Sequence, residues 1–190
     1  YKKDLSISRR VHDESGEALT LMNIGGVLRH QKMFFQAFES YQKSFNIFSL
    51  IGDEYHKSQT ILNMGNLFLE VEDLNKAEYC FKRSLSSFVE RNHQNDQAIA
   101  LANLGELYVK QKKFDLAFSC FQESFSIFEL IGSRHYSGII ALNIAQLYFE
   151  IENIEQTKEF LAKSILLLNQ NSNGYSEAIN LQQKITSFQS

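Results

Sequence analysis

The sequence predicts an all-α fold, a solenoid of stacked antiparallel helix hairpins, on two observations. The first is an internal period of 40 residues, the mark of repeated supersecondary units. The tripeptide Asn-Ile-Gly at 23–25 returns as Asn-Met-Gly at 63–65, as Asn-Leu-Gly at 103–105 and as Asn-Ile-Ala at 143–145. The second is the apolar spacing inside each unit. Ile61, Met64, Gly65 and Phe68 fall at i, i+3, i+4 and i+7, which places them on one face of a helix.

Three further series of residues hold the same period in the second half of each unit. Four coincident series at one spacing divide the chain into repeats at 13–52, 53–92, 93–132 and 133–172. The three series are Ala37, Ala77, Ala117 and Thr157; Ser44, Ser84, Ser124 and Ser164; and Phe48, Phe88, Phe128 and Leu168.

Each repeat is predicted to be two helices joined by a short polar turn. In the second repeat the turn is Glu72-Asp73, and the apolar series resumes at Leu74. An aspartate or asparagine directly before a helix caps it, because its side-chain oxygen accepts a hydrogen bond from a free backbone N–H. We expect Asp53, Asp73 and Asn153 to act in this way.

The two ends of the sequence depart from the repeat. Subtracting the period from Phe45 and Ile51 lands on Leu5 and Val11, so residues 1–12 are predicted to be the end of a preceding second helix, and the chain to be part of a longer protein. After a loop, residues 173–190 are predicted to form an amphipathic helix with a polar outer face, as a solenoid cap requires. A fifth repeat that is incomplete is the alternative.

Glycine in the middle of a helix costs about 1 kcal/mol relative to alanine, so its return at 25, 65 and 105 needs a packing reason. We expect these glycines, with Ala37, Ala77 and Ala117, to let the two helices of a hairpin approach closely. On this interpretation Gly105→Leu separates the helices.

Composition excludes several classes of protein. The 190 residues carry 19 Lys+Arg against 22 Asp+Glu, with no run of basic residues, which argues against nucleic acid and against an anionic membrane as partners. No apolar stretch is long enough to span a membrane. Two cysteines, Cys80 and Cys120, are too few for a disulfide framework, which favours a reducing, cytoplasmic location.

The repeat resembles the tetratricopeptide repeat. Leu104-Gly105-Glu106-Leu107-Tyr108 followed by Ala117 and Phe121 is the copy most similar to that family's pattern, and the fourth repeat, with Ala145, Thr157 and Leu161, is the most divergent. The 40-residue period is similar to that of Pins/LGN-type adaptors, kinesin light chains and ciliary members of the family. The resemblance implies a right-handed superhelix whose first helices line a concave face.

No residues in the sequence form a recognisable catalytic or metal site. The five histidines show no i, i+4 pairing and no Cys or carboxylate partner at ligand spacing, and there is no phosphate-binding loop or nucleophile elbow. We therefore predict no catalytic residue, no metal, no cofactor and no enzymatic activity.

The resemblance places one asparagine of each repeat on the concave face. An asparagine side chain both donates and accepts hydrogen bonds, so a ladder of them can hold an extended peptide backbone. Residues at −4, +3 and +7 from each asparagine share its face. The predicted peptide-binding residues are Asn23, Asn63, Asn103, Asn143, Asn66, Glu106, Gln146, Gln59, Ile99, Ile139, His30, Glu70, Lys110 and Glu150.

These residues predict a non-catalytic protein–protein interaction module that binds an extended or helical segment of a partner in the concave groove. Three carboxylates against one lysine favour a neutral to mildly basic segment. Two alternatives remain: a structural subunit docked in a large assembly, of the motor or ciliary type, through its outer surfaces, and a peptide-sensing regulatory domain.

One substitution separates the binding role of the ladder from a structural role. A hydrogen bond contributes about 0.5–1.5 kcal/mol net, so Asn63→Ala is expected to weaken binding in the groove several-fold and to leave the melting temperature nearly unchanged. Titration calorimetry and thermal denaturation measure the two quantities. A large loss of stability with unchanged binding would assign the asparagine to the fold.

Overall fold

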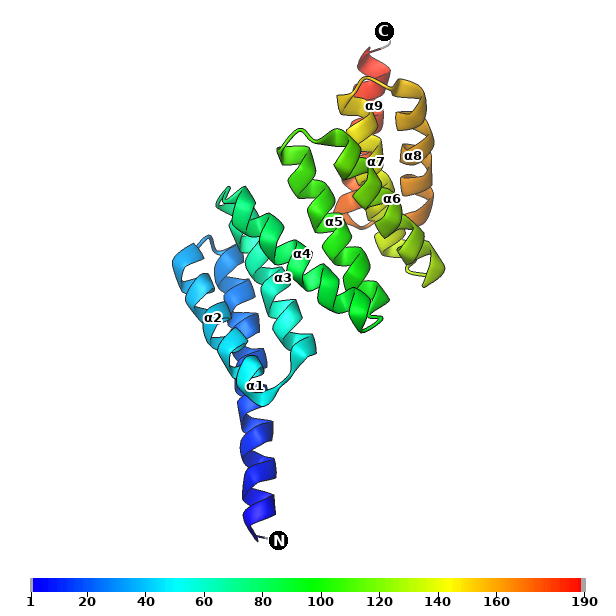
Figure 1. The fold of residues 1–190 in the computed structure, drawn as a ribbon. Coiled ribbons are helices and arrows are strands. Elements are labelled where there is room, and N and C mark those ends of the chain that lie inside the picture. Colours follow the sequence, from blue (N-terminus) through cyan, green and yellow to red (C-terminus); the bar gives the residue numbers. More distant parts are fainter. Residues whose placement is uncertain (1, 189–190) are drawn as a thin grey trace. The chain divides into compact units, whose positions relative to one another are not determined.

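The computed structural model describes the backbone of residues 2–188 and the side chains of residues 14–187. Within this part of the chain there are nine α-helices and no strand (Figure 1), which confirms the all-α prediction. The helices are α1 (Lys2–His30), α2 (Phe34–Ile51), α3 (Glu54–Glu70), α4 (Leu74–Glu90), α5 (Gln94–Lys110), α6 (Phe114–Leu130), α7 (Arg134–Glu150), α8 (Ile154–Leu167) and α9 (Asn173–Phe188).

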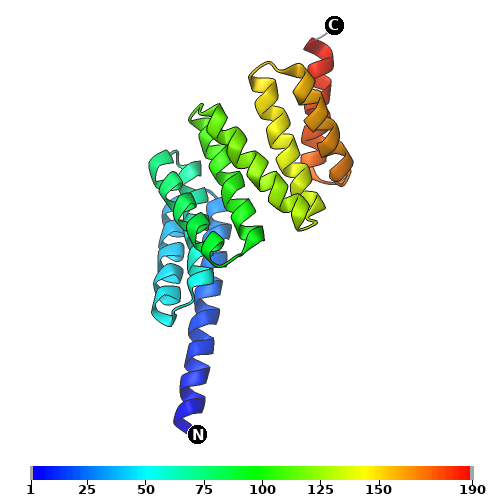
Figure 2. The ribbon, with the colours of Figure 1, turned by 45° about the vertical axis from the view of Figure 1, so that its right-hand side comes forward.

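The chain divides into two compact units, Tyr1–His93 and Gln94–Ser190. In the first unit α1 pairs with α2, α3 pairs with α4, and α2 packs against α3. In the second unit α5 pairs with α6 and α7 with α8, α6 packs against α7, and α9 covers the end of the α7/α8 hairpin (Figure 2). Each unit is therefore a stack of two helix hairpins, and the second unit has one helix more.

The predicted caps are present at the start of three helices. Asp53, Asp73 and Asn153 precede α3, α4 and α8, and the side chain of each accepts a hydrogen bond from the backbone N–H three residues later. The N···O distances are 3.0, 3.2 and 3.2 Å. Local sequence therefore determines where these helices begin.

The structure differs from the expected helix end at residue 12. Helix α1 runs without interruption from Lys2 to His30, so residues 2–12 and the first helix of the first repeat are one helix, while residue 1 lies outside the described residues. At the equivalent point of the next repeat, Gly52 ends α2 with a left-handed backbone, at φ +73°. Residue 12 is a histidine, which enters that conformation less readily than glycine, and the helix continues through it.

Three mid-helix glycines lie against an aromatic ring of the paired helix. A Cβ atom placed on Gly25 would lie 2.6 Å from the ring of Tyr41, and one on Gly65 would lie 2.5 Å from the ring of Phe81. A Cβ on Gly105 would lie 2.6 Å from Cδ1 of Phe121. The sequence predicted close packing here, but the group that requires the glycine is the ring sixteen residues later. The nearby alanines are buried without making this contact.

The fourth repeat replaces this pair with a different one. Ala145 stands where the others have glycine, and Leu161 stands where the others have the ring. Both side chains are buried, and they share a core cluster with Leu142, Leu181 and Ile185. A smaller, non-aromatic partner leaves room for the extra methyl group, so the divergence noted in the sequence is a matched exchange across one contact.

The serine series ties the two helices of a hairpin together in the first and third repeats. The hydroxyl groups of Ser44 and Ser124 donate to the backbone carbonyls of Ala18 and Ala98, both at 2.8 Å. Position 18 becomes serine at Ser58 and glycine at Gly138 in the other two repeats. There Ser84 bonds within its own helix, to the Phe81 carbonyl.

A double-mutant cycle tests the glycine–ring contact. Gly105→Ala is expected to destabilise the protein by about 1–2 kcal/mol, because overpacking outweighs the gain in helix propensity. Combining it with Phe121→Leu recreates the Ala145/Leu161 pair, so the double variant is expected to lose less than the two single variants together, by about 1 kcal/mol. Urea denaturation followed by circular dichroism measures the three values.

Gly16→Ala is the matched control, because no atom lies within 4 Å of a Cβ placed there. It is expected to be neutral or stabilising by up to about 1 kcal/mol. Strict additivity of Gly105→Ala and Phe121→Leu would contradict the proposed contact.

Candidate functional site

The second unit presents two surfaces built from different helices. We call the surface of α5, α7 and α9 the A face and the surface of α6 and α8 the B face. The predicted binding residues of this unit lie on α5 and α7, the first helices of its two hairpins.

A cavity of about 320 Å³ lies on the A face between α5 and α7, and we call it the first cavity. Five of the predicted residues line it together. They come from two helices that are far apart in the sequence, so their spacing along the chain does not by itself place them in one cavity. The lining residues are Glu106, Val109, Lys110, Phe121, Asn143, Gln146, Leu147 and Glu150.

Three residues of this lining were not predicted. Val109 and Leu147 belong to the apolar series that packs the helices, and Phe121 comes from α6. Phe121 is only 1% exposed, so its ring forms part of the floor. The glycine-ring packing described above therefore also builds the bottom of the cavity.

The polar side chains of the first cavity are free to bind a ligand. Asn143 is half-buried and has no hydrogen-bond partner among the described residues, while Lys110, Gln146 and Glu150 are exposed. Glu106 is accessible at the rim, but the protein around its carboxyl partly desolvates it and raises its pKa, and the charge of Lys110 acts against that rise. A carboxylate in this state gains from a cation beside it.

The A face continues onto α9 through a second cavity, of about 400 Å³, between α7 and α9. Gln146 lines both cavities. The four α9 residues in the second cavity have the same i, i+3, i+4, i+7 spacing as Asn143, Gln146, Leu147 and Glu150. The lining residues are Gln146, Phe149, Glu177, Asn180, Leu181 and Lys184.

Sequence reasoning missed these α9 residues because the period changes before this helix. Glu177 occupies the place of Asn143 but follows it by 34 residues instead of 40, so the asparagine series does not point to it. A search for the i, i+3, i+4, i+7 spacing of polar and apolar residues, without a fixed period, would have found it.

Two of the predicted residues of the first unit, Glu70 and Gln59, have partners elsewhere in the protein. Arg29 of α1, which was not predicted, forms an ion pair with Glu70 of α3 at an N···O distance of 2.5 Å. Burial raises the pKa of the Tyr41 hydroxyl, and the charge of Arg29 lowers it. Gln59 donates a hydrogen bond to the Tyr55 hydroxyl at 2.8 Å. Glu70 therefore has a partner in the protein.

The remaining predicted residues lie on first helices but outside the cavities described above. Asn23 and His30 are exposed on α1. The others are half-buried: Asn63 and Asn66 on α3, Ile99 and Asn103 on α5, and Ile139 on α7.

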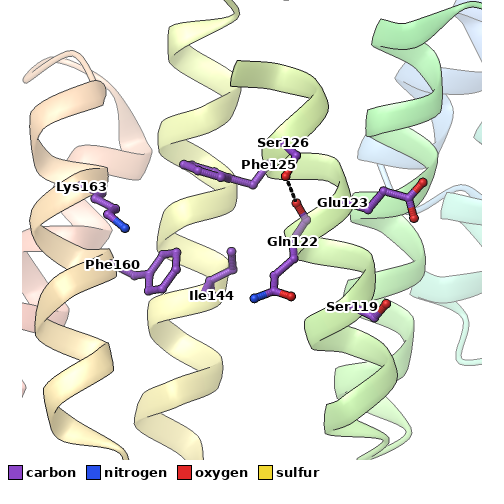
Figure 3. A pocket seen from close by; sticks show the side chains of 8 residues that line it. All are labelled: Ser119, Gln122, Glu123, Phe125, Ser126, Ile144, Phe160 and Lys163. Atoms are coloured by element: carbon purple, nitrogen blue, oxygen red, sulfur yellow. Dashed lines mark hydrogen bonds between the residues drawn. The ribbon is translucent and has the colours of Figure 1, made fainter. Parts of the chain in front are cut away.

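The B face carries a cavity of its own, of about 430 Å³, between α6 and α8 (Figure 3). Ile144 of α7 and the rings of Phe125 and Phe160 supply its apolar part. Lys163 lies over the Phe160 ring, 4.5 Å from its centroid, and pairs with Glu159 at 2.8 Å. The lining residues are Ser119, Gln122, Glu123, Phe125, Ser126, Ile144, Phe160 and Lys163.

Other chemistry has no site in the part of the chain that the structure describes. No group of three His, Cys, Asp or Glu side chains there is arranged to hold a metal ion. Burial raises the pKa of the Cys80 thiol to about 11, so little reactive thiolate forms at neutral pH. None of the described helices combines the length and apolar character needed to cross a membrane.

Comparison with known proteins gives one sequence family and a set of similar backbones. The sequence matches the profile of the tetratricopeptide repeat over residues 16–88 and 96–170. No curated protein matches the chain. Aspartyl phosphate phosphatase F from Bacillus subtilis is similar in backbone, with a TM-score of 0.81 and 14% identity over 92% of this chain and 45% of that one.

Two further crystal structures have the same kind of fold. The apo form of RapI has a TM-score of 0.74 and 15% identity, over 93% of this chain and 53% of that one. BtubC (BKLC) from P. vanneervenii has a TM-score of 0.59 and 11% identity, over 96% of this chain and 91% of that one. The chain thus spans about half the length of the first two, and identities this low show the fold alone.

The desolvated carboxyl of Glu106 predicts a pH-dependent cost to stability. A carboxyl whose pKa is raised by folding destabilises the folded state when it is ionised, and this cost disappears as the pH falls below its ordinary pKa. Glu106→Gln is therefore expected to raise the melting temperature slightly at pH 7 and to leave it unchanged near pH 3. Glu123→Gln, at an exposed position in the middle of α6, controls for the loss of one negative charge away from the helix ends. Equal effects of the two variants would contradict the prediction.

Proposed function

Because this chain belongs to the tetratricopeptide repeat family, we propose that it is a protein–protein interaction module that binds a segment of its partner on the A face. The observation that carries the proposal is the first cavity. Five side chains chosen from the sequence as peptide ligands, on two different helices, line one hollow of about 320 Å³. The segment is captured without chemical change to it, so the module is a non-catalytic adaptor.

The polar groups of the first cavity suit a peptide backbone. Asn143 and Gln146 each offer one acceptor and two donors, so each can pair with a backbone C=O and N–H whatever the side chain beside them. Neighbouring helices pack about 8–10 Å apart, which corresponds to about three residues of an extended chain. On this proposal the amide side chain of each first helix hydrogen-bonds to the backbone of every third residue of the bound segment.

The charges of the first cavity favour a neutral to mildly basic segment. Glu106 and Glu150 oppose the single charge of Lys110, and the net negative potential attracts a cationic side chain. The paired lysines or arginines that hold a terminal carboxylate in chaperone adaptors are missing from this lining.

We place the module in the cytoplasm, as part of a longer chain or larger complex.

The B face supports a second candidate function, docking inside a larger assembly. Its cavity of about 430 Å³ has two phenylalanine rings, which bury well against an apolar side chain of a partner. On this alternative the A face is only a solvated surface. A peptide-sensing regulatory role is the other alternative; it can use either face and requires an output domain outside these residues.

A peptide selection decides between the two faces. Random dodecamers displayed on phage are selected on the protein, and enriched peptides are synthesised with a fluorescent label for polarisation titrations. The double variant Asn143→Ala/Gln146→Ala removes two hydrogen-bonding groups from the A face, so it is expected to weaken binding about ten-fold. Ser119→Ala/Gln122→Ala makes the same kind of change on the B face and is expected to alter it less than two-fold.

The opposite ranking of these double variants would move the binding site to the B face and support the docking alternative. Enrichment of no peptide, from a protein shown by circular dichroism to be folded, would contradict the proposal. The melting temperatures of both variants are measured beside the wild type, because lost binding counts only in a folded protein.

A further inference from the structure

The A face of the second unit is longer than the repeat pattern indicates, because α9 contributes to it. The first and second cavities lie on either side of α7 and share Gln146. A chain bound across α5 and α7 therefore meets a second hollow, of about 400 Å³, on continuing past α7. Helix α9 is attached to this unit by buried Ala178, Leu181 and Ile185, which keeps its polar residues at a defined place.

The charge at one position reverses from α7 to α9. Glu150 and Lys184 each stand seven residues after the first member of their four-residue set, Asn143 and Glu177, so they occupy equivalent places on neighbouring helices. Both side chains are exposed, and neither forms an ion pair with another described residue. In the first unit, by contrast, Glu70 is paired with Arg29.

The surroundings of Glu150 strengthen its preference for a cation. Glu106 lines the same cavity, and partial desolvation makes its carboxylate gain from a neighbouring positive charge. Lys110 is the only cation in that lining, so the cavity retains net negative charge. In the second cavity Lys184 is the only cation and Glu177 the only carboxylate, so that lining is neutral overall. Lys184 lies one helical turn from Asn180 and two turns from Glu177, so an acidic side chain is favoured only at the Lys184 end.

We propose that α9 is part of the binding site, and that the bound segment is extended and carries one basic and one acidic residue three positions apart. This inference rests on the function proposed above. The basic side chain lies in the first cavity against Glu150 and Glu106, and the acidic side chain lies in the second cavity against Lys184. The separation follows from the packing distance of helices, about 8–10 Å, and a rise of about 3.3 Å per extended residue.

A charge-swapped protein tests the proposal with peptides of defined composition. The probes are two pools of fluorescently labelled dodecamers, Lys-x-x-Glu and Glu-x-x-Lys, with uncharged residues elsewhere. The wild type is expected to bind one order about five-fold more tightly than the other, because the bound chain has one direction. Glu150→Lys/Lys184→Glu keeps the net charge of the protein and is expected to invert the preferred order.

The two single variants assign each position. Glu150→Lys is expected to favour a pool with Glu at both positions, and Lys184→Glu a pool with Lys at both positions. Pools with the charges two or four residues apart are expected to bind more weakly than the three-residue spacing. The wild type, the two single variants and the double variant are compared by circular dichroism to show that all four are folded. The substitutions leave the buried side of α9 unchanged.

The outcomes separate this inference from the function on which it rests. If the double swap leaves the order preference unchanged while Asn143→Ala/Gln146→Ala still weakens binding, α9 only caps the unit and the inference is wrong, although the A-face function stands. If the pools bind equally to wild type and to Asn143→Ala/Gln146→Ala, the A face is not the binding site and both proposals are wrong. Inversion of the preferred order supports both.

Discussion

The close contact between a mid-helix glycine and an aromatic ring is the interaction on which the rest of this structure depends. It brings the two helices of a hairpin together where Gly25 meets Tyr41, Gly65 meets Phe81 and Gly105 meets Phe121. The rings are almost wholly buried, and burial of such a side chain contributes on the order of 2–3 kcal/mol to folding. This gain exceeds the cost of placing glycine in a helix.

The first helices combine a heavily packed side with a polar side. Helices α3, α5 and α7 bury eight residues each, whereas Glu106 and Lys110 of α5 and Gln146 and Glu150 of α7 are exposed. In the second unit that side holds amides and unpaired charges above the Phe121 ring, so the cavity is polar at its walls and apolar at its floor. In the first unit the equivalent surface is partly neutralised by the Arg29–Glu70 pair. The two units share a fold but differ in the charges that their first helices expose.

Helix α9 shows how a change of period can extend a surface. Glu177 of α9 follows Asn143 of α7 by 34 residues instead of 40. The exposed residues Glu177, Asn180 and Lys184 nevertheless have the same spacing as the lining residues of α7. The helix covers the apolar end of the last hairpin with one side and lengthens the A face with the other. A terminal helix of a repeat protein can therefore add residues to a surface as well as cover the apolar end of the last repeat.

The sequence by itself determined the helical class, the hairpin unit, the three side-chain caps and the choice of Asn143, Gln146, Glu106, Glu150 and Lys110 as surface residues. These follow from local rules, since period and capping are properties of neighbouring residues. Tertiary structure alone decided which of these side chains share a cavity, because that depends on how two helices pack. It also decided that α9 joins them and that a ring, not an alanine, requires each glycine. The place of α9 carries no periodic signal because the spacing changes before that helix. The glycines and their rings both recur with the 40-residue period, but recurrence alone does not show that they touch.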